Sequence, residues 1–363
     1  MSRLYAVIMA GGSGTRFWPA SRQDRPKQLL AIGGDAPLLR QTADRIAPLI
    51  PPERQLVITA ARTVDAVRAL LPGLPAAQVV GEPEGRDTAA CIGLASRLLA
   101  RLDPDAIGIA MPADHVIADA GIYLDCLRAA QAALDASPGS ILVFGIEPDR
   151  AATGYGWLRR GDSAGRHGGL EVFTLAGFVE KPGREKAKEL LASGSHYWNA
   201  GLFAFRPAAL AAAYDRHLPE MGPALDALAA AWGTPRFADV LAERYPRLTK
   251  ISIDYGLMEK VGGEGGALLL PLPVRWDDVG AWDALARLLP ADSAGNVAQG
   301  DAALLECRGL IVSATGGLVA AKGVEDLIVV HTPDATLVCR RDDAEGVKQV
   351  VEALRVRGLL KYQ

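Results

Sequence analysis

The chain has 363 residues, half of them hydrophobic, and a formal net charge of −3. This length can bury a large core and leaves room for a second, smaller domain. Because positive and negative charges are nearly balanced, the chain offers no basic field, and we expect neither nucleic acid nor a membrane as a partner.

The cysteines and the apolar runs indicate the cellular context. Cys91, Cys126, Cys307 and Cys339 have no CxxC spacing and no histidine partners, so we expect free thiols in the cytoplasm and not zinc ligands. The apolar runs fall short of the ~18 residues that a membrane span needs. The first one is also shorter than the core of a signal peptide. These features predict a cytoplasmic globular protein.

Apolar runs and helical periodicity alternate through the first 150 residues. The runs show no alternation, which is typical of strands buried on both faces, and they occupy residues 4–10, 55–60, 106–111 and 140–145. Alanine and leucine recur with helical spacing over residues 38–50, 61–71, 87–102 and 121–136. This order predicts an α/β fold with a doubly wound, mainly parallel, Rossmann-like sheet.

The rest of the chain has a different texture. "TGYGWLRRG" and "LEVFTLAGFVEKP" predict hairpin strands, and "REKAKELLASG" predicts a helix that ends at a glycine. A helical block follows over 207–245, then a strand, a loop and a helix over 267–289. Short Val, Ile and Leu strands over 302–340 predict a small β-helix-like domain before an amphipathic helix over 342–358. We place the domain boundary between residues 290 and 291.

The first strand runs into "GGSGTRFWPASRQDRPK", a glycine-rich turn of the kind that binds phosphate. Gly11, Gly12 and Gly14 permit positive φ and bring backbone N–H groups close to an anion. The loop lacks the third glycine of the Rossmann fingerprint and the Gly-Lys pair of the P-loop. It carries Arg16, which can fork onto two oxygens, and Lys27, a mobile point charge. We expect it to wrap a triphosphate; a plain turn with surface cations is the alternative.

Seven further stretches occur in the order of a known family. They are "GEPEGRDTAA", "MPADHVI", "TGYGWL", "FVEKP", "YWNAGLFAF", "SIDYGLMEK" and "WDDVGAW", and with the glycine loop they span residues 7–282. Together they resemble the sugar-1-phosphate nucleotidyltransferases, and most of all the mannose-1-phosphate guanylyltransferases. The tail is similar to the family's left-handed β-helical piece. The resemblance implies a GT-A-like catalytic domain over 1–290, and a β-helix-like domain with a terminal helix over 291–363.

The resemblance also implies the reaction, in which GMP passes from GTP to α-D-mannose 1-phosphate and pyrophosphate leaves. The attacking phosphate is already an anion, so positioning and neutralisation of charge carry the catalysis. Mg²⁺ suits this task, and Asp114 and Asp278 match the family's metal ligands. Asp277 remains an alternative to Asp278, and a helix N-cap remains an alternative role for Asp114. We expect Arg16 and Lys27 to lie near the two carboxylates.

Recognition of the sugar phosphate is assigned by the same resemblance. Glu180 and Asn199 match contacts to mannose hydroxyls, and Gly156 lets the ring approach the backbone. Lys181 is placed to meet the phosphate. Asp254 is expected either to support this wall or to cap a helix.

Recognition of the nucleotide falls on two segments. The phosphate-binding loop of the family is matched by Gly11, Gly12, Gly14 and Thr15. Guanine presents N–H donors, which favour a carboxylate from Glu82 or Asp87, with Thr88 assisting. The family usually shows "GRNTAP" where this chain has "GRDTAA", so the side chain that reads the base stays open.

Several alternatives remain at this point. The same scaffold also handles glucose-, rhamnose-pathway or heptose 1-phosphates with UTP, dTTP or GTP. A non-catalytic sugar-nucleotide-binding relative is disfavoured because the expected catalytic residues are all present. A dehydrogenase is disfavoured by the missing fingerprint. Longer relatives add a cupin-type isomerase domain, and since the sequence stops at 363 we expect transferase activity alone. The limited core of the tail suggests that it packs on the main domain or on a second subunit, and we expect a homodimer.

Overall fold

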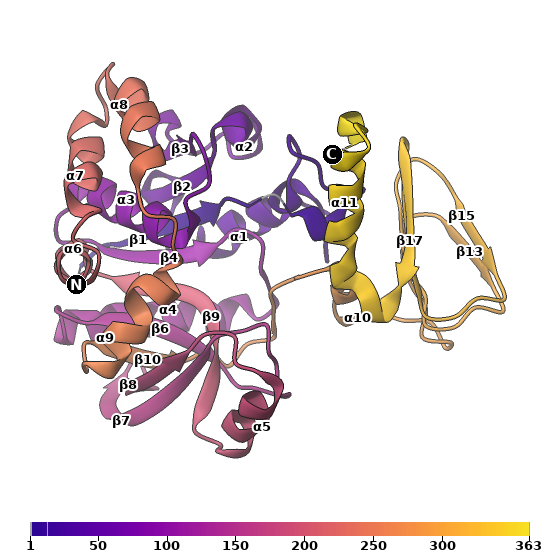
Figure 1. Cartoon of the computed structure of the whole chain (residues 1–363). Coiled ribbons are helices and arrows are strands. Elements are labelled where there is room, and N and C mark those ends of the chain that lie inside the picture. Colours follow the sequence, from indigo (N-terminus) through magenta and orange to yellow (C-terminus); the bar gives the residue numbers. More distant parts are fainter. Residues whose placement is uncertain (1, 13, 363) are drawn as a thin grey trace. The chain divides into compact units, whose positions relative to one another are not determined.

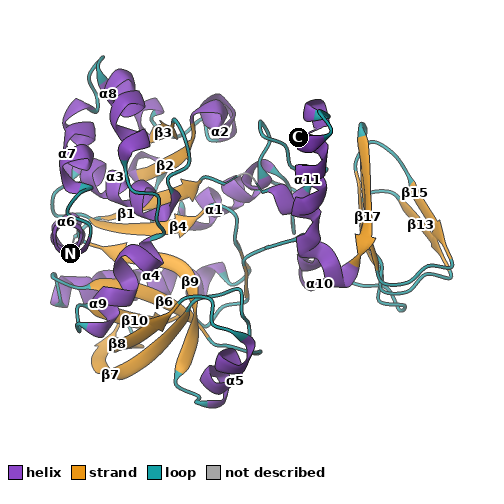
Figure 2. Ribbon diagram, viewed as in Figure 1, coloured by secondary structure: helices purple, strands orange, loops and turns teal. Residues whose placement is uncertain are grey.

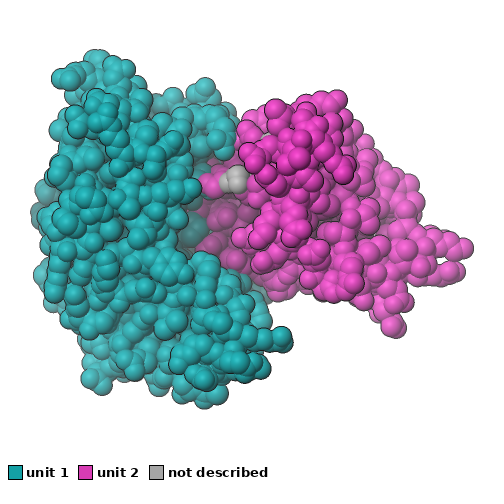
Figure 3. Space-filling view, in the orientation of Figure 1, with its two compact units in different colours: residues 1–11, 43–112, 117–276 teal, residues 12–42, 113–116, 277–363 magenta. Residues whose placement is uncertain are grey.

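The computed structural model describes residues 2–12 and 14–362, which form two compact units (Figure 3). Unit 1 comprises residues 1–11, 43–112 and 117–276, and unit 2 comprises residues 12–42, 113–116 and 277–363. The glycine-rich loop from residue 12 onward is therefore grouped with the C-terminal segment. The predicted boundary between residues 290 and 291 divides the chain into two continuous domains, whereas these units are each made of several segments. That boundary stays a prediction.

Unit 1 is built on a large sheet with the strand order β3-β2-β1-β4-β9-β6-β10-β8-β7 (Figure 1). Its strands are β1 (Leu4–Ala10), β2 (Gln55–Ala60), β3 (Val79–Glu82), β4 (Ile107–Pro112), β6 (Ile141–Ile146), β7 (Trp157–His167), β8 (Leu170–Val179), β9 (His196–Phe205) and β10 (Ala267–Pro271). Two-residue strands lie at β5 (Val116–Ile117) and β11 (Trp276–Asp277).

The first half of the sheet is parallel, as the sequence predicts. β1 pairs in parallel with β2 and β4, and β2 with β3. One more parallel pair, β6 with β10, lies beyond β9 in the second half. The four predicted apolar runs correspond to β1, β2, β4 and β6, and nearly every residue of these strands is buried. Helices alternate with the strands along this part of the chain (Figure 2), so both faces of each strand meet apolar side chains.

The second half of the sheet contains antiparallel strands. β9 lies between β4 and β6 and is antiparallel to both. Its register with β6 shifts between Val143 and Gly145, which marks a bulge, and Gly201 within β9 has a φ of +69°. The predicted hairpin is confirmed as β7 and β8, which pair in antiparallel fashion.

Helices of unit 1 follow the predicted segments closely. They are α1 (Leu38–Ile46, whose first five residues are grouped with unit 2), α2 (Val64–Leu70), α3 (Asp87–Leu102), α4 (Ala120–Ala136), α5 (Arg184–Ala192), α6 (Pro207–His217), α7 (Gly222–Ala231), α8 (Phe237–Arg244) and α9 (Glu259–Gly263). A 3-10 turn, η6 (Tyr245–Arg247), ends the helical block, and a π-helix, η7 (Asp254–Met258), directly precedes α9. α3 packs against α6 and α7, and their leucines join the strands in one core.

Unit 2 contains the β-helix-like segment expected near the C-terminus. Its strands are β12 (Val297–Gln299), β13 (Ala302–Leu305), β14 (Ile311–Ala314), β15 (Val319–Lys322), β16 (Leu327–Thr332) and β17 (Ala335–Arg340). β12, β14 and β16 stack in parallel, and β13 pairs in parallel with β15. Each coil thus places a strand directly on the strand of the coil before it. β17 closes the stack in antiparallel fashion.

The core of unit 2 joins the N-terminal loop to the C-terminal coils. Phe17 and Trp18, next to the 3-10 turn η1 (Thr15–Phe17), are buried with Ile311 and Ile328 of the coils. The remaining elements of unit 2 are η2 (Lys27–Leu29), η8 (Trp282–Ala284), α10 (Leu285–Leu288), η9 (Arg341–Gly346), α11 (Val347–Val356) and η10 (Leu360–Tyr362). Over residues 2–12 and 14–362, no helix has both the length and the hydropathy to cross a membrane.

Candidate active site

The predicted catalytic residues of unit 2 meet at one cavity. It has a volume of about 320 Å³ and is lined by Gly14, Thr15, Arg16, Phe17, Lys27, Asp114, His115, Asp278 and Gly280. The structure therefore brings together two cations and two carboxylates that are up to 262 positions apart, between residues 16 and 278, in the sequence. This convergence is the arrangement expected for holding phosphate groups.

Lys27 is held at the centre of this cavity. Its Nζ donates to Asp114 Oδ2 and to the backbone oxygen of Asp278, each at 2.8 Å. Only 8% of the side chain is exposed, and Nζ lies 5.6 Å from the centre of the Phe17 ring. The sequence interpretation of Lys27 as a mobile charge is therefore wrong, because two hydrogen bonds and an aromatic ring fix its position.

Arg16 is the accessible cation of the cavity. Its Nη1 donates to the backbone oxygen of Gly280 at 3.0 Å and lies 3.9 Å from Glu345 Oε1. The side chain is 45% exposed. A guanidinium carries five N–H donors, so this side chain retains donors for a phosphate.

Glycine is required at different positions of the loop for different physical reasons. Gly12 and Gly14 have φ values of +92° and +60°. A Cβ on Gly14 would lie 2.6 Å from the Cβ of Lys27 and 2.8 Å from its backbone nitrogen, so only glycine allows this approach. Ser21 donates from its hydroxyl to the Gly14 oxygen at 2.7 Å and closes the loop. Gly11 belongs to unit 1, where the carboxylate of Glu82 lies beside it.

The two adjacent aspartates, Asp277 and Asp278, have different surroundings. Asp277 accepts two hydrogen bonds from Arg287 and one from the backbone nitrogen of Val279. It is therefore committed to structure, whereas Asp278 lines the cavity. This difference favours Asp278 as the ligand.

The ionisation state of Asp114 suits a cation site. Burial by itself would raise the pKa of the carboxyl, but the ammonium of Lys27, followed by the neighbouring His115, lowers it, and the net pKa lies below its ordinary value. Asp114 is thus ionised at neutral pH. Two carboxylates on one cavity fit a hard divalent cation that takes a few protein oxygens and completes its shell with phosphate oxygens and water. Over residues 2–12 and 14–362, no three His, Cys, Asp or Glu side chains gather as a complete metal cage.

The predicted sugar residues meet in unit 1. A Cβ on Gly156 would lie 2.5 Å from Glu180 Oε2 and 3.3 Å from the Cβ of Asn199, so these three residues are in contact. The need for glycine at 156 thus comes from the Glu180 carboxylate itself. Lys181 has a φ of +46° and pairs with Glu180 Oε1. Asn199 donates from Nδ2 to Asp254 Oδ1 at 2.9 Å and accepts at Oδ1 from the Gly201 nitrogen at 3.0 Å.

The candidates for reading the base have unequal access. Glu82 is 8% exposed and accepts a short hydrogen bond from the Tyr245 hydroxyl. Burial raises the pKa of Glu82 to about 7, with the Tyr245 bond opposing that shift. Asp87 is exposed at the start of α3, with a φ of +63°. Thr88 accepts from the Ile253 nitrogen at 2.8 Å. This access favours Asp87 over Glu82 as the residue that meets a ligand.

Comparisons with known proteins agree with this geometry. The family described as nucleotidyl transferase matches residues 5–294, and the one described as MannoseP isomerase/GMP-like beta-helix domain matches residues 300–354. The chain belongs to the nucleotidyl transferase family. Mannose-1-phosphate guanylyltransferases of Escherichia coli and Salmonella typhimurium are 35% and 37% identical to it, over 98% of this chain and 74% of each relative.

A solved structure is similar along almost the whole chain. The crystal structure described as mannose-1-phosphate geranyltransferase from Thermus thermophilus is 38% identical to this nucleotidyl transferase, with a TM-score of 0.85. The match covers 97% of this chain and 99% of that one. The predicted fold class and family are thereby confirmed.

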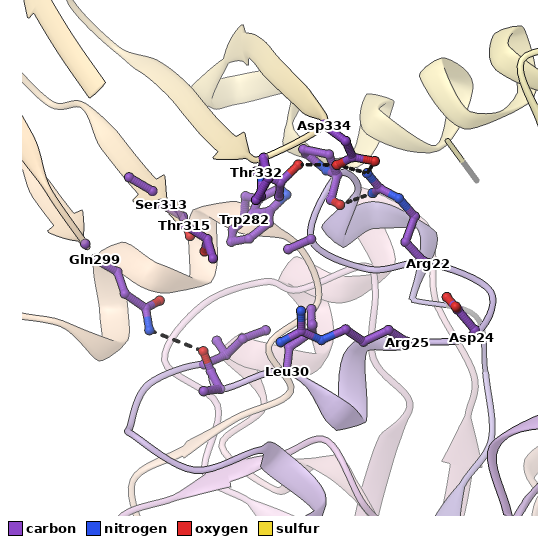
Figure 4. A pocket seen from close by; sticks show the side chains of 17 residues that line it. Arg22, Asp24, Arg25, Leu30, Trp282, Gln299, Ser313, Thr315, Thr332 and Asp334 are labelled. Carbon is purple, nitrogen blue, oxygen red and sulfur yellow. Dashed lines mark hydrogen bonds and ion pairs between the residues drawn. The ribbon is translucent and has the colours of Figure 1, made fainter. Parts of the chain in front are cut away.

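In this nucleotidyl transferase, the segment over residues 22–31, which contains Lys27, contacts the C-terminal coils at both of its ends (Figure 4). Arg22 forms a double ion pair with Asp334, at 3.0 and 3.2 Å, and Gln299 donates to the Ala31 oxygen at 3.2 Å. A second cavity of about 480 Å³ lies between these anchors, and Trp282 forms part of its wall. The coils therefore take part in positioning the catalytic loop.

Two residues of this nucleotidyl transferase were missed or left undecided by sequence reasoning. Tyr245 holds the carboxylate of Glu82, and the sequence around "ERYPRL" carries no signal for that contact. Asp254 bonds to Asn199 across 55 positions, and its place in "SIDYGLMEK" was the available signal. Both contacts depend on non-local packing.

Proposed function

We propose that the chain transfers GMP from GTP to α-D-mannose 1-phosphate and releases GDP-mannose and pyrophosphate. The observation that carries the proposal is the cavity that Arg16, Lys27, Asp114 and Asp278 line in a member of the nucleotidyl transferase family. The names of the similar proteins support the choice of mannose 1-phosphate and a guanine nucleotide.

In the proposed reaction, unit 2 handles the phosphates. A phosphate oxygen of the sugar attacks the α-phosphorus of GTP, and pyrophosphate leaves on the opposite side. Arg16 binds and orients phosphate oxygens through its free donors, and Lys27 offsets negative charge at a fixed point. Gly12, Gly14 and Thr15 shape the loop around the triphosphate. Asp114 and Asp278 would hold Mg²⁺, which when bound polarises phosphoryl oxygens.

Unit 1 supplies recognition in the same proposal. Glu180 accepts hydrogen bonds from the sugar hydroxyls, and the Asn199 amide donates to them. Gly156 leaves room for the Glu180 carboxylate. Lys181, which lies beside Glu180, pairs with the sugar phosphate. Asp87, which is exposed, accepts from guanine, and Thr88 supports the start of α3. Glu82 and Gly11 form the part of the nucleotide-binding surface next to them, where Tyr245 holds the Glu82 carboxyl.

The decisive experiment measures pyrophosphate release from GTP and mannose 1-phosphate with magnesium. The purified chain is compared across GTP, UTP and dTTP and across mannose, glucose and heptose 1-phosphates. We expect the pair of GTP and mannose 1-phosphate to give the highest kcat/KM. Preference for another pair would move the chain to a different branch of the family, and release from none would reject the enzyme proposal.

Metal dependence is a separate prediction. Chelation with excess EDTA is expected to abolish turnover, because the carboxylate pair then loses the cation that offsets its charge next to the phosphates. Added Mg²⁺ should restore it. Full turnover in EDTA would reject the assignment of Asp114 and Asp278 as metal ligands.

The assembly and location are also proposals. Leu305, Leu318 and Val338 of unit 2 are 56%, 64% and 59% exposed, which supports a homodimer that covers apolar surface. Light scattering that gives the monomer mass would reject it. The four cysteines are free, with Cys339 partly exposed and the others buried, which supports the cytoplasm as the location. We also propose domains over residues 1–290 and 291–363.

A further inference from the structure

The cavity between the catalytic loop and the C-terminal coils has no part in the proposed reaction. It lies within unit 2, where residues 19–32 form one side and residues 299–334 of the coils form the other (Figure 4). Its volume of about 480 Å³ falls within the range of roughly 300–1,000 Å³ that ligand pockets occupy. This space, which we call the coil cavity, is therefore large enough for a small metabolite.

The coil side of this cavity is polar, although the adjoining part of the same coils is apolar. Alternate residues of a strand share one face, and the stacked strands β12, β14 and β16 align these faces. Val297, Ile311 and Ile328 are buried in the core that contains Trp18. Two or four positions further along each strand, the residues that line the cavity are Gln299, Ser313, Thr315 and Thr332. Amide and hydroxyl groups thus replace aliphatic side chains where the cavity begins.

Two arginines on the loop side of the cavity differ in how their charge is used. Arg22 donates to both oxygens of Asp334, at 3.0 and 3.2 Å, and to backbone oxygens of its own turn. Arg25 is exposed, and its guanidinium has no hydrogen bond or ion pair within residues 2–12 and 14–362. Figure 4 shows its side chain extending away from the Asp24 carboxylate. Arg25 therefore offers the cavity a positive charge and five N–H donors.

The turn that carries Arg25 leads directly into the catalytic loop. The backbone nitrogens of Arg22 and Arg25 each donate to the oxygen of the other residue, at 2.9 and 3.1 Å. Lys27 follows two positions later, and its backbone oxygen accepts from the nitrogen of Leu30, which lines the cavity, at 2.9 Å. A ligand held by Arg25 and the coils would therefore restrain the backbone on both sides of Lys27.

The walls of the coil cavity favour a phosphate ester of a sugar. A guanidinium binds two phosphate oxygens at once. The hydroxyls of Ser313 and Thr315 have no hydrogen-bond partner in the part of the chain that the structure describes, so they are available to sugar hydroxyls. Trp282 is the aromatic residue among the described lining residues, but it is 2% exposed and offers no ring face to a nucleotide base.

We propose that the coil cavity binds a phosphate ester of a small sugar, with Arg25 on the phosphate and the coils on the sugar, and that this ligand strengthens nucleotide binding. The effect on the nucleotide rests on the proposed function, whereas binding of the ester does not. By joining the Arg25 turn to the coils, the ligand favours the arrangement in which Lys27 meets Asp114 and the backbone of Asp278. We expect the KM for GTP to fall about fivefold or more.

Calorimetric titration of the full chain tests the binding without turnover. The sugar probes are glucose 6-phosphate and mannose 6-phosphate, which have no 1-phosphate to attack a nucleotide. GMP and inorganic phosphate are the nucleotide and free-anion probes. Arg25→Gln is expected to weaken binding of a hexose 6-phosphate roughly 10–100-fold, as for loss of a hydrogen bond to a charged group, and to leave GMP binding unchanged.

Control variants separate the coil cavity from the catalytic cavity. Arg308→Gln is the matched control, because Arg308 is exposed on the coils and does not line the coil cavity. It should bind the hexose 6-phosphate as the wild type does, and so should Arg16→Ala. Ser313→Ala should weaken the hexose 6-phosphate severalfold and inorganic phosphate hardly at all, because the hydroxyl faces the sugar in this proposal.

Kinetics test the effect on the nucleotide. The KM for GTP is measured with mannose 1-phosphate, with and without a saturating hexose 6-phosphate. We expect the ester to lower the KM for GTP in the wild type and to have no effect in Arg25→Gln. Without the ester, Arg25→Gln should match the kcat and KM of the wild type, because Arg25 lies outside the catalytic cavity.

The outcomes distinguish this proposal from the proposed function. The site is overturned if neither hexose 6-phosphate binds in an Arg25-dependent way, or if Arg16→Ala abolishes binding and Arg25→Gln does not. Arg25-dependent binding of GMP, or equally tight binding of inorganic phosphate, overturns the choice of a sugar ester. An unchanged KM for GTP overturns the regulation. Arg25-dependent binding in a chain that does not use GTP and mannose 1-phosphate overturns the proposed function alone.

Discussion

Lys27 carries a full charge at a position that is 6% exposed, and its two hydrogen bonds explain how that charge is tolerated. A buried ammonium requires paired acceptors, and Asp114 and the backbone of Asp278 supply them. The pairing also serves the carboxylate, since Lys27 keeps the pKa of Asp114 low against the effect of burial. One cation thus maintains both the shape and the ionisation of the cavity.

Substitution of these residues tests the chemistry directly. Lys27→Ala and Asp278→Ala are each expected to lower kcat about 10²–10³-fold, the usual loss for one electrostatic contact to a transition state. Lys348→Ala is the matched control, because Lys348 is exposed on α11. Pyrophosphate release gives the rates, and circular dichroism checks the fold. Turnover close to that of wild type in either variant would contradict the assigned role.

Glu82 predicts a pH dependence of stability. Its pKa is about 7 in the folded chain and 4.5 as a free side chain. Between these values the unfolded carboxyl releases its proton while the folded one keeps it, so the free energy of unfolding falls as pH rises from 4.5 to 7 and then levels off. The loss is on the order of 3 kcal/mol. Asp254, whose pKa burial raises to about 7, adds a slope of the same sign.

Glu82→Gln isolates that contribution. The amide oxygen of glutamine can still accept from Tyr245, but the group no longer titrates. Thermal unfolding from about pH 4.5 to about pH 8 is expected to show a smaller loss of stability with rising pH in this variant than in wild type. Glu171→Gln, an exposed position on β8, should keep the full slope. Equal slopes in wild type and Glu82→Gln would show that Glu82 does not titrate in this window.

At the scale of elements, the glycine loop owes its shape to one close approach. Gly14 lies against the backbone and Cβ of Lys27 at distances that no other side chain permits. The loop therefore cannot be moved at residue 14 without moving Lys27. This contact connects the η1 turn to the η2 turn, and through Lys27 it connects both turns to Asp114.

Gly14→Ala is expected to displace Lys27 and lower kcat more than tenfold, since strain of about 1–3 kcal/mol at a positive φ adds to the steric conflict. Gly121→Ala on α4 is the control, because a Cβ there meets no atom within 4 Å. Rates and melting temperatures of both variants are compared with wild type. A Gly14→Ala enzyme with unchanged rate would mean that the loop tolerates a side chain beside Lys27.

The elements that the sequence predicts well share one physical property. β1, β2, β4 and β6 are buried on both faces, so their unbroken apolar runs are visible without knowledge of any contact. β9 begins with "HYWN", where His196 and Asn199 interrupt the apolar pattern, and only its end "LFAF" is an unbroken apolar run. The glycine-rich loop allowed site residues to be predicted from the sequence. The Tyr245 contact could not be predicted, because it depends on packing that leaves no local sequence pattern.

At the scale of the whole chain, the sequence did not predict which segments make up unit 2. Residues 12–42 follow a strand of the large sheet, yet they are grouped with residues 277–363. The contacts responsible join Phe17 and Trp18 to positions 279–347, and such long separations have no periodic signature. The C-terminal segment is therefore part of the framework of the catalytic loop, although its sequence resembles a separate appendage.

Removal of α11 and η10 tests this framework. Val347 shares the core of Phe17, and Trp18 Nε1 donates to the Tyr362 oxygen at 2.6 Å. A chain ending at Gly346 is expected to lose at least about 10²-fold in turnover, because Arg16 and Lys27 lose their support. Unit 1 should keep its cooperative melting, since its core draws on residues 5–269. Val356→Ala, at a position 78% exposed on the same helix, should retain wild-type turnover. Full activity in the shortened chain would show that the loop is ordered without the helix.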